Sequence, residues 1–161
     1  MAEKDENGEK ERSMQAGNVE EIANCLDNFG GIFRLSQLPR VKILSVPISL
    51  IILAYDHWIA IFIDEHVVEI MDSTGHMGSD GLHKFLRRFL YGHIYNKKFT
   101  ITPPLQDDQS NICALFALAF LYYRTYTNQT LCDFVKLFST DKTKNCQTIQ
   151  KIYEIVVNIE K

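Results

Sequence analysis

The sequence lacks the signatures of several large functional classes. Its four cysteines form no C-x-x-C pair, and it contains neither an H-E-x-x-H nor a G-x-S-x-G motif. These absences argue against a zinc site of the usual spacing, a zinc protease and a serine hydrolase of the α/β type. We therefore expect no metal ion and no cofactor.

Long apolar runs and basic charge are also scarce. The apolar stretch 46–54 is far shorter than the roughly 20 residues that span a bilayer, so it predicts a buried strand. The net charge is −3 and the pI is about 5.9, whereas nucleic-acid binders usually carry a basic excess. The charged N-terminus does not resemble a secretory signal. We expect an intracellular protein of the cytoplasm or nucleus, with reduced cysteines and without membrane or DNA partners.

The chain length of 161 residues fits one domain. Residues 1–17 contain charges, glycine and serine but almost no apolar pattern, which predicts a disordered charged leader. Residues 18–161 are expected to form the domain, and a monomer is favoured.

Hydrophobic periodicity divides the domain into helices and strands. The predicted strands are 48–55, 57–63, 66–71 and 99–102, and the predicted helices are 18–26, 82–90, 113–123, 131–138 and 149–159. Ser79 or Asp80 can cap the helix 82–90, and Thr130 can cap the helix 131–138. Residues 28–31, with two glycines, are expected to end the first helix in a turn. The segment 113–123 is apolar almost all round, which is typical of a buried central helix. The pattern predicts an α+β fold, with a small, mainly antiparallel sheet packed against several helices, one of them central.

Cys113 is the cysteine best placed for chemistry. It lies where a polar loop meets the buried helix, and Ser110 or Asn111 can cap that helix. A thiol at a helix N-terminus feels the positive end of the helix dipole, so a lowered pKa and a nucleophilic thiolate are expected. The alternative is a small buried hydrophobic residue. The other cysteines are expected to pack against helices (Cys25, Cys132) or to have no role (Cys146).

His57 and Asp72 are the candidate base and the candidate orienting acid. A catalytic cysteine needs a base that accepts the thiol proton and returns it to the leaving amine. His57 begins a strand and precedes Trp58, a better position than those of the other four histidines. Around a turn at Asp64-Glu65, His57 is seven residues before Asp64, and Asp72 is seven after Glu65. The two side chains are then level, so the carboxylate can orient the imidazole; an aspartate that only starts a turn is the alternative.

Amide groups near Cys113 can stabilise an oxyanion. The backbone N–H of Cys113 supplies one donor at the helix start, and a glutamine amide from the preceding loop can supply another. Gln106 and Gln109 are both candidates, seven and four residues before the cysteine.

Together these residues resemble the adenovirus-type cysteine proteases, the adenain-like family, including its polinton-virus relatives. The matching segments are HWIAIF at 57–62, MDSTG at 71–75 and QDDQSNICALF at 106–116. The order His-Trp, Asp, Gln, Cys is also similar, more distantly, to the SUMO-deconjugating cysteine proteases. The resemblance covers about residues 18–125.

The resemblance implies a viral-type cysteine endopeptidase of adenain-like, papain-like architecture. Such an enzyme cleaves precursor proteins, such as virion or capsid proteins, after small residues, and it works in virion maturation, packaged in the virion. The implied catalytic residues are His57, Asp72, Gln106 and Cys113. The family's glutamine stands seven residues before its cysteine, which selects Gln106 over Gln109.

The sequence departs from the family pattern at several points. Ala114 stands where the family usually has glycine, and Asp72 stands where adenovirus enzymes often have glutamate. The stretch 96–101 contains no cysteine, so an activating peptide joined by a disulfide is not expected. The acidic pI also argues against DNA as an activator.

Two other functions stay open at the level of sequence. One is removal of a ubiquitin-like modifier by the same chemistry. The other is a catalytically silent relative that binds a partner or serves as a capsid component, for which Ala114 is the best support.

Overall fold

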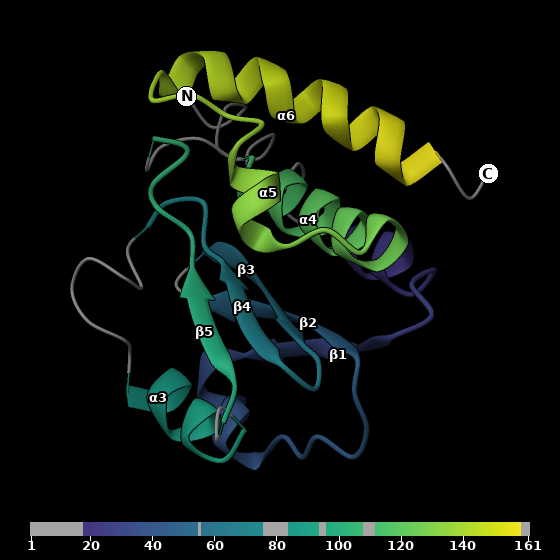
Figure 1. Cartoon of the computed structure of the whole chain (residues 1–161), viewed down its shortest axis with the longest axis vertical. Helices are drawn as coiled ribbons and strands as arrows, with labels where there is room; N and C mark the ends of the chain where they lie inside the picture. The colour runs from purple at the N-terminus through teal and green to yellow at the C-terminus, as the bar shows by residue number, and fades with distance from the viewer. Residues whose placement is uncertain (1–17, 55, 76–83, 94–95, 108–111, 159–161) are drawn as a thin grey trace, which may run out of the picture.

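A mixed five-stranded sheet forms the centre of the fold (Figure 1). The computed structural model describes residues 18–54, 56–75, 84–93, 96–107 and 112–158. The strands, in chain order and also in sheet order, are β1 (Phe29–Arg34), β2 (Ile48–Ala54), β3 (His57–Ile63), β4 (Val67–Met71) and β5 (Lys98–Ile101). The helices are η1 (Leu35–Arg40), α3 (Lys84–Tyr91), α4 (Cys113–Thr127), α5 (Leu131–Val135) and α6 (Lys142–Val157). Residues 18–23 are also helical, and the α+β class is confirmed.

The strands pair in both directions. β3 is antiparallel to both β2 and β4, whereas the edge strands β1 and β5 run parallel to β2 and β4. A parallel pair needs a crossover connection, and η1 and α3 lie in the two crossovers. The three central strands are therefore antiparallel, in agreement with the expected mainly antiparallel sheet, and the two parallel edge strands make the sheet mixed.

Strand β1 is not predicted by the sequence pattern, because its two glycines are typical of a turn. A Cβ on Gly30 would lie 2.5 Å from Cδ1 of Ile48 and 2.8 Å from Cδ2 of Leu50. Gly31 has a φ of +130°, and the pairing with β2 shifts between Phe29 and Gly31. The glycines thus allow an irregular strand to approach β2 closely. Of the predicted turn at 28–31, only Asn28 lies in a turn, and residues 29–31 belong to β1.

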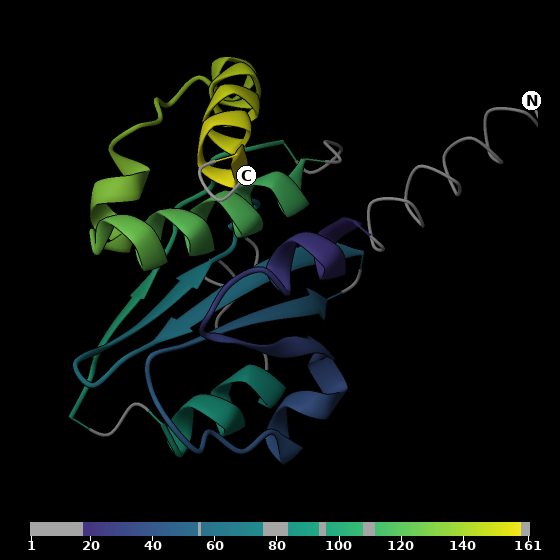
Figure 2. The same cartoon turned by 90° about the vertical axis from the view of Figure 1, so that its right-hand side faces the viewer.

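The sheet separates two apolar cores (Figures 1 and 2). One face packs against α4, with α5 and α6 beyond it, and the other face packs against η1 and α3. Side chains of β3 alternate between the two cores: Ala60 and Phe62 lie on the α4 side, and Ile59, Ile61 and Ile63 on the α3 side. This period of two is the expected geometry of a strand buried on both faces.

Helix α4 is the central helix that the sequence predicted. Most of its side chains between Cys113 and Arg124 are buried, including Phe116 and Phe120, which are fully buried. The helix ends at Asn128, whose φ of 57° is left-handed. The position of Cys113 is therefore set by the packing of the whole helix against the sheet.

A buried ion pair ties the C-terminal part of α4 to the sheet. Nε of Arg124 lies 2.7 Å from Oε1 of Glu69, and its Nη2 lies 3.3 Å from Oδ2 of Asp64. The guanidinium carbon lies 4.5 Å from the centre of the Phe62 ring. Oε2 of Glu69 accepts a hydrogen bond of 2.8 Å from the backbone N–H of Leu131, so the same carboxylate also holds α5.

Helices α5 and α6 have local N-terminal caps. Thr130 caps α5, as predicted, by accepting from the N–H of Asp133, and Asp141 caps α6 by accepting from the N–H of Lys144. The leader 1–17, the expected caps Ser79 and Asp80, and the apolar residues Leu82 and Ile159 lie outside the described residues. Within the described ranges, none of the helices has the length and apolarity needed to cross a bilayer.

Candidate active site

The ends of three strands and the start of helix α4 meet at one edge of the sheet, the edge formed by strand ends and not by an edge strand. His57 is the first residue of β3, Asp72 directly follows β4, and Thr102 directly follows β5. Because β3 is antiparallel to β4, and β4 is parallel to β5, the start of β3 lies at the same edge as the ends of the other two strands. Cys113, the first residue of α4, reaches this edge from the helical layer.

The thiol of Cys113 contacts the start of β3. Its Sγ accepts a hydrogen bond of 3.4 Å from the backbone N–H of Trp58, the residue next to His57. The Cys113 side chain is only 5% exposed. Ile112 is the N-cap of α4 and makes no side-chain capping bond, while the predicted caps Ser110 and Asn111 lie outside the described residues. The thiol of Cys113 therefore lies against the first two residues of β3.

The pKa of Cys113 differs from the sequence-based expectation. Burial raises the pKa of the thiol above its ordinary value, and the negative charge of Asp72 adds to the rise. The backbone N–H groups of Trp58, Ala114 and Cys113 itself act in the opposite direction but do not outweigh burial. The expected lowering of the pKa is wrong, because the tight contact of α4 with β3 removes water from the thiol.

Alkylation of Cys113 by iodoacetamide is expected to accelerate with pH, with a midpoint above that of the same cysteine in the denatured chain. Only the thiolate reacts, and the raised pKa of the buried thiol delays its formation. Peptide mass mapping from about pH 6 to about pH 11 measures the midpoint. Alkylation of the exposed Cys25 and Cys132 in the same sample shows that the iodoacetamide is active. A midpoint below that of the denatured chain would contradict the expectation.

The register between β3 and β4 differs from the predicted one by two residues. Ala60 pairs with Met71, so the continuation of the ladder places Asp72 across from Ile59 and not from His57. The turn between the strands causes this difference. Oδ1 of Asp64 accepts hydrogen bonds from the backbone N–H groups of His66 and Val67. This moves the turn centre one residue beyond Asp64-Glu65.

The pairing between β3 and β4 ends at Ala60 and Met71, so His57 and Asp72 both lie beyond it. The charge of Asp72 acts on the thiol of Cys113, and His57 precedes Trp58, whose N–H donates to that thiol. These interactions, and not the strand register, connect the two residues with Cys113.

Asp72 is held in a buried turn. Its side chain is 1% exposed, and its Oδ1 accepts from the N–H of Thr74 at 3.2 Å and from the Thr74 hydroxyl at 2.8 Å. Its backbone N–H donates to Oγ1 of Thr102 at 2.7 Å, and its carbonyl accepts from the same hydroxyl at 2.8 Å. Thr74 therefore holds the carboxylate of Asp72, and Thr102 at the end of β5 holds its backbone.

Gln106 is fully buried and is attached to the residue after Asp72. The hydroxyl of Ser73 donates to Oε1 of Gln106. The carbonyl of Ser73 accepts from the backbone N–H groups of Leu105, at 2.7 Å, and of Gln106, at 3.1 Å. The amide nitrogen of Gln106 lies 3.4 Å from the carbonyl oxygen of Asp107. Gln109, the other candidate, lies outside the described residues.

The structure adds three residues that the sequence did not single out. Ser73 and Thr102 hold the Asp72 turn and the Gln106 segment. Asn145 of α6 is 1% exposed. Its Nδ2 donates a hydrogen bond of 3.0 Å to the carbonyl of Leu105, the residue before Gln106. Serine, threonine and asparagine are common in turns and caps, so no local pattern distinguishes these three.

Gly75 closes the turn that carries Asp72. Its N–H donates to the carbonyl of Asp72 at 3.0 Å, and its φ is +76°. A Cβ at this position would lie 2.5 Å from Cγ of Pro104 and 3.0 Å from its backbone nitrogen. Glycine therefore allows the Asp72 turn to touch the segment that leads to Gln106.

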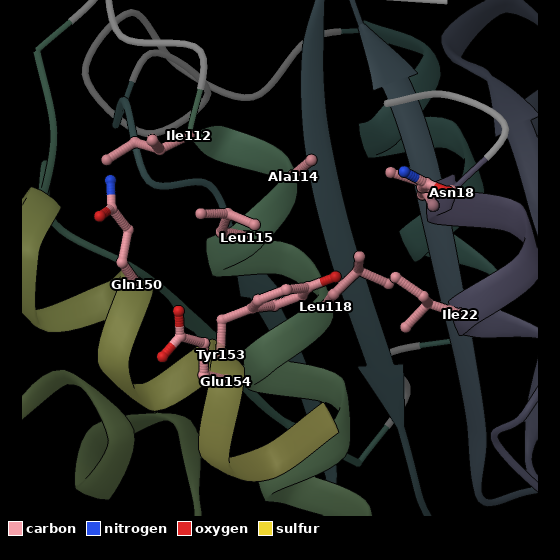
Figure 3. A pocket seen from close by; sticks show the side chains of 10 residues that line it. Asn18, Ile22, Ile112, Ala114, Leu115, Leu118, Gln150, Tyr153 and Glu154 are labelled. Atoms are coloured by element: carbon pink, nitrogen blue, oxygen red, sulfur yellow. The ribbon is translucent and has the colours of Figure 1, made fainter. Parts of the chain in front are cut away.

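A groove of about 450 Å³ lies beside the start of α4 (Figure 3). It runs between the helical residues 18–23, α4 and α6. Its lining residues are Asn18, Val19, Ile22, Ile112, Ala114, Leu115, Leu118, Gln150, Tyr153 and Glu154. Ala114, which stands in place of the family's glycine, lies on this groove, whereas the thiol of Cys113 faces Trp58. The groove is thus a neighbour of the candidate site, and none of the four expected catalytic residues lines it.

The other cysteines and possible metal ligands lie apart from this site. Cys25 and Cys132 are exposed and Cys146 is half-buried, all as free thiols, so the expected helix packing of the first two is wrong. Among the described residues, no group of three or more His, Cys, Asp or Glu side chains is placed to hold a metal ion.

No protein-family model matches the chain, and a search of curated proteins found no similar sequence.

Proposed function

We propose that the protein is a cysteine endopeptidase in which Cys113 is the nucleophile. The observation that carries this proposal is the hydrogen bond from the Trp58 N–H to Sγ of Cys113, which places the thiol at the strand end that begins with His57. The charge of Asp72 acts on the same thiol, and Gln106 is bound to the residue after Asp72. A nucleophile, a base, an acid and an amide donor thus come from four separate segments that converge on one edge of the sheet.

The raised pKa of Cys113 implies that the resting thiol is neutral. Attack on a peptide carbonyl then transfers the Sγ proton to the imidazole of His57 as the carbon–sulfur bond forms. The imidazolium gives this proton to the amine as the carbon–nitrogen bond breaks. Water, deprotonated by His57, then hydrolyses the thioester and releases the thiol and the new carboxyl group. Asp72 would orient the imidazole and stabilise its cation.

Amide groups around the thiol are suited to the developing oxyanion. The N–H groups of Cys113 and Ala114 at the start of α4 act to lower the pKa of the thiol. The side-chain amide of Gln106 would add a donor, as the resemblance to the adenain-like family implies. Donors fixed before the reaction stabilise the oxyanion without a reorganisation cost.

The resemblance extends the proposal to the substrate and to the place of action. It favours precursor proteins of a virion or capsid, cut inside the cell or the assembling particle. Proteins of this kind are the substrates that we propose, with no cofactor, and the removal of a ubiquitin-like modifier is a variant of the same chemistry.

A second candidate is a catalytically silent relative that binds a partner or serves as a capsid component. The observation that favours it is the burial of Cys113, which is 5% exposed and has a raised pKa. A non-reactive thiol would show the same two properties.

Protein cleavage tests the proposal directly. The full chain and its Cys113→Ala variant are incubated with glycine-containing peptides and with proteins from the native context, and new N-termini are identified by mass spectrometry. We expect cleavage by the wild type only, and by a Cys132→Ala control, which lacks an exposed cysteine on α5. Equal cleavage by Cys113→Ala would refute the nucleophile, and no cleavage by any variant would support the silent relative.

A further inference from the structure

We propose that Ser73 is a positioning residue that sets the direction of the Gln106 side-chain amide. This inference rests on the proposed function, because it assigns Ser73 a part in oxyanion stabilisation. The contact that carries it is the hydrogen bond from the Ser73 hydroxyl to Oε1 of Gln106.

The direction of this hydrogen bond decides which end of the amide faces Ser73. Ser73 is 1% exposed and Gln106 is not exposed at all, so the hydroxyl proton needs a partner inside the protein. The structure uses the Gln106 carbonyl as that partner. The two N–H donors of the amide are therefore directed away from Ser73. An oxyanion needs N–H donors, so a flipped amide would present the wrong atom.

Ser73 also fixes the backbone from which Gln106 projects. Its carbonyl accepts from the N–H groups of both Leu105 and Gln106, at 2.7 and 3.1 Å. Gln106 is thus held at its backbone and at its side chain by a single residue. Because Asp72 precedes Ser73, one dipeptide sets both the orienting acid and the amide donor.

Hydrolysis should therefore depend on the Ser73 hydroxyl, although none of its contacts described above is with Cys113 or His57. Removing the hydroxyl leaves the backbone contacts of Ser73 intact and frees the amide to rotate. The loss should appear in the transition state, where the oxyanion forms, and not in ground-state binding.

Kinetics of Ser73→Ala test the inference. We expect kcat to fall by about 10- to 100-fold with little change in KM, since removal of a whole oxyanion donor costs about 10²–10³. Alkylation of Cys113 by iodoacetamide forms no oxyanion, so its rate should stay unchanged. Ser73→Thr, which keeps a hydroxyl, should recover most of kcat.

Two further variants separate positioning from a general structural effect. In a Gln106→Ala background, Ser73→Ala should cause no additional loss, because the amide that it positions is gone. Ser49→Ala is the matched control. Ser49 lies in β2 and is also fully buried, and its hydroxyl donates a hydrogen bond of 3.0 Å to Oδ1 of Asn28. It should leave kcat unchanged.

The outcomes distinguish the two proposals. An active wild type with an unchanged Ser73→Ala variant, an additive loss in the double variant, or an equal loss in Cys113 alkylation would overturn the positioning role alone. A wild type that cleaves nothing, or cleavage that persists in Cys113→Ala, would overturn the proposed function and the positioning role together.

Discussion

Replacement of His57 by alanine is expected to lower kcat/KM for peptide hydrolysis by about 10³- to 10⁴-fold, in line with the loss of a general acid–base residue. The effect should be large because the thiol of Cys113 has a raised pKa and is neutral at rest. An already ionised thiolate would need a base less. Without His57, the thiol loses the side chain that we propose as the carrier of its proton to the leaving amine.

The control for His57 is a second histidine outside the candidate site. His66 lies in the turn between β3 and β4, at the end of β3 opposite to His57. His66→Ala should retain the wild-type rate of peptide cleavage. Initial rates of peptide cleavage, measured together with circular dichroism of each variant, distinguish chemistry from misfolding. A His57→Ala variant that folds and keeps more than about a tenth of the wild-type rate would exclude a role as the base.

Asp72 and Gln106 depend on contacts that connect distant parts of the chain. The Thr102 hydroxyl joins Asp72 to the end of β5, the Ser73 hydroxyl joins the same turn to Gln106, and Asn145 joins the neighbouring carbonyl to α6. The acid and the amide are thus parts of one hydrogen-bonded unit. Cys113, the proposed nucleophile, reaches that unit from α4, so the position of this helix on the sheet controls the arrangement of all the proposed catalytic residues.

The sequence predicts the elements that carry the candidate site because each depends on local periodicity. The change from polar loop to apolar helix predicts that α4 starts close to Cys113, and the run of β-branched and aromatic residues in 57–63 predicts β3 with the bounds that the structure shows. These patterns reflect which side chains face water, and the two apolar cores satisfy that requirement.

Features that depend on tertiary contact could not be predicted in the same way. The Asp64 side chain moves the β3–β4 turn by one residue, and nothing in a two-residue polar turn shows which of its residues will accept the backbone N–H groups. The hydrogen bond from Ser73 to Gln106 joins positions 33 residues apart and leaves no local trace. Burial of Cys113 likewise depends on the β3 backbone above it, so the helix end alone predicted the wrong direction of its pKa.

Replacement of Arg124 by methionine is expected to lower the free energy of unfolding by about 3–5 kcal/mol, the usual cost of removing one partner of a buried ion pair. Arg124 is 5% exposed, and its loss leaves the carboxylate of Glu69 buried, with the N–H of Leu131 as its remaining partner described above. Methionine retains apolar volume against the Phe62 ring, so the effect reports the unpaired charge and not a cavity. Urea unfolding followed by circular dichroism measures the change.

Two matched variants identify the cause of this loss. Adding Glu69→Gln to Arg124→Met should restore part of the stability, because the amide oxygen of glutamine can still accept from Leu131 while the buried charge is removed. Lys136→Met breaks an exposed pair with Asp133, 3.9 Å apart, and should leave unfolding unchanged. If Arg124→Met costs less than about 1 kcal/mol, the pair does not anchor α4. If the cost is as expected, the same variant should also lose activity at temperatures where it is still folded, because the anchor at the C-terminal part of α4 keeps Cys113 against the start of β3.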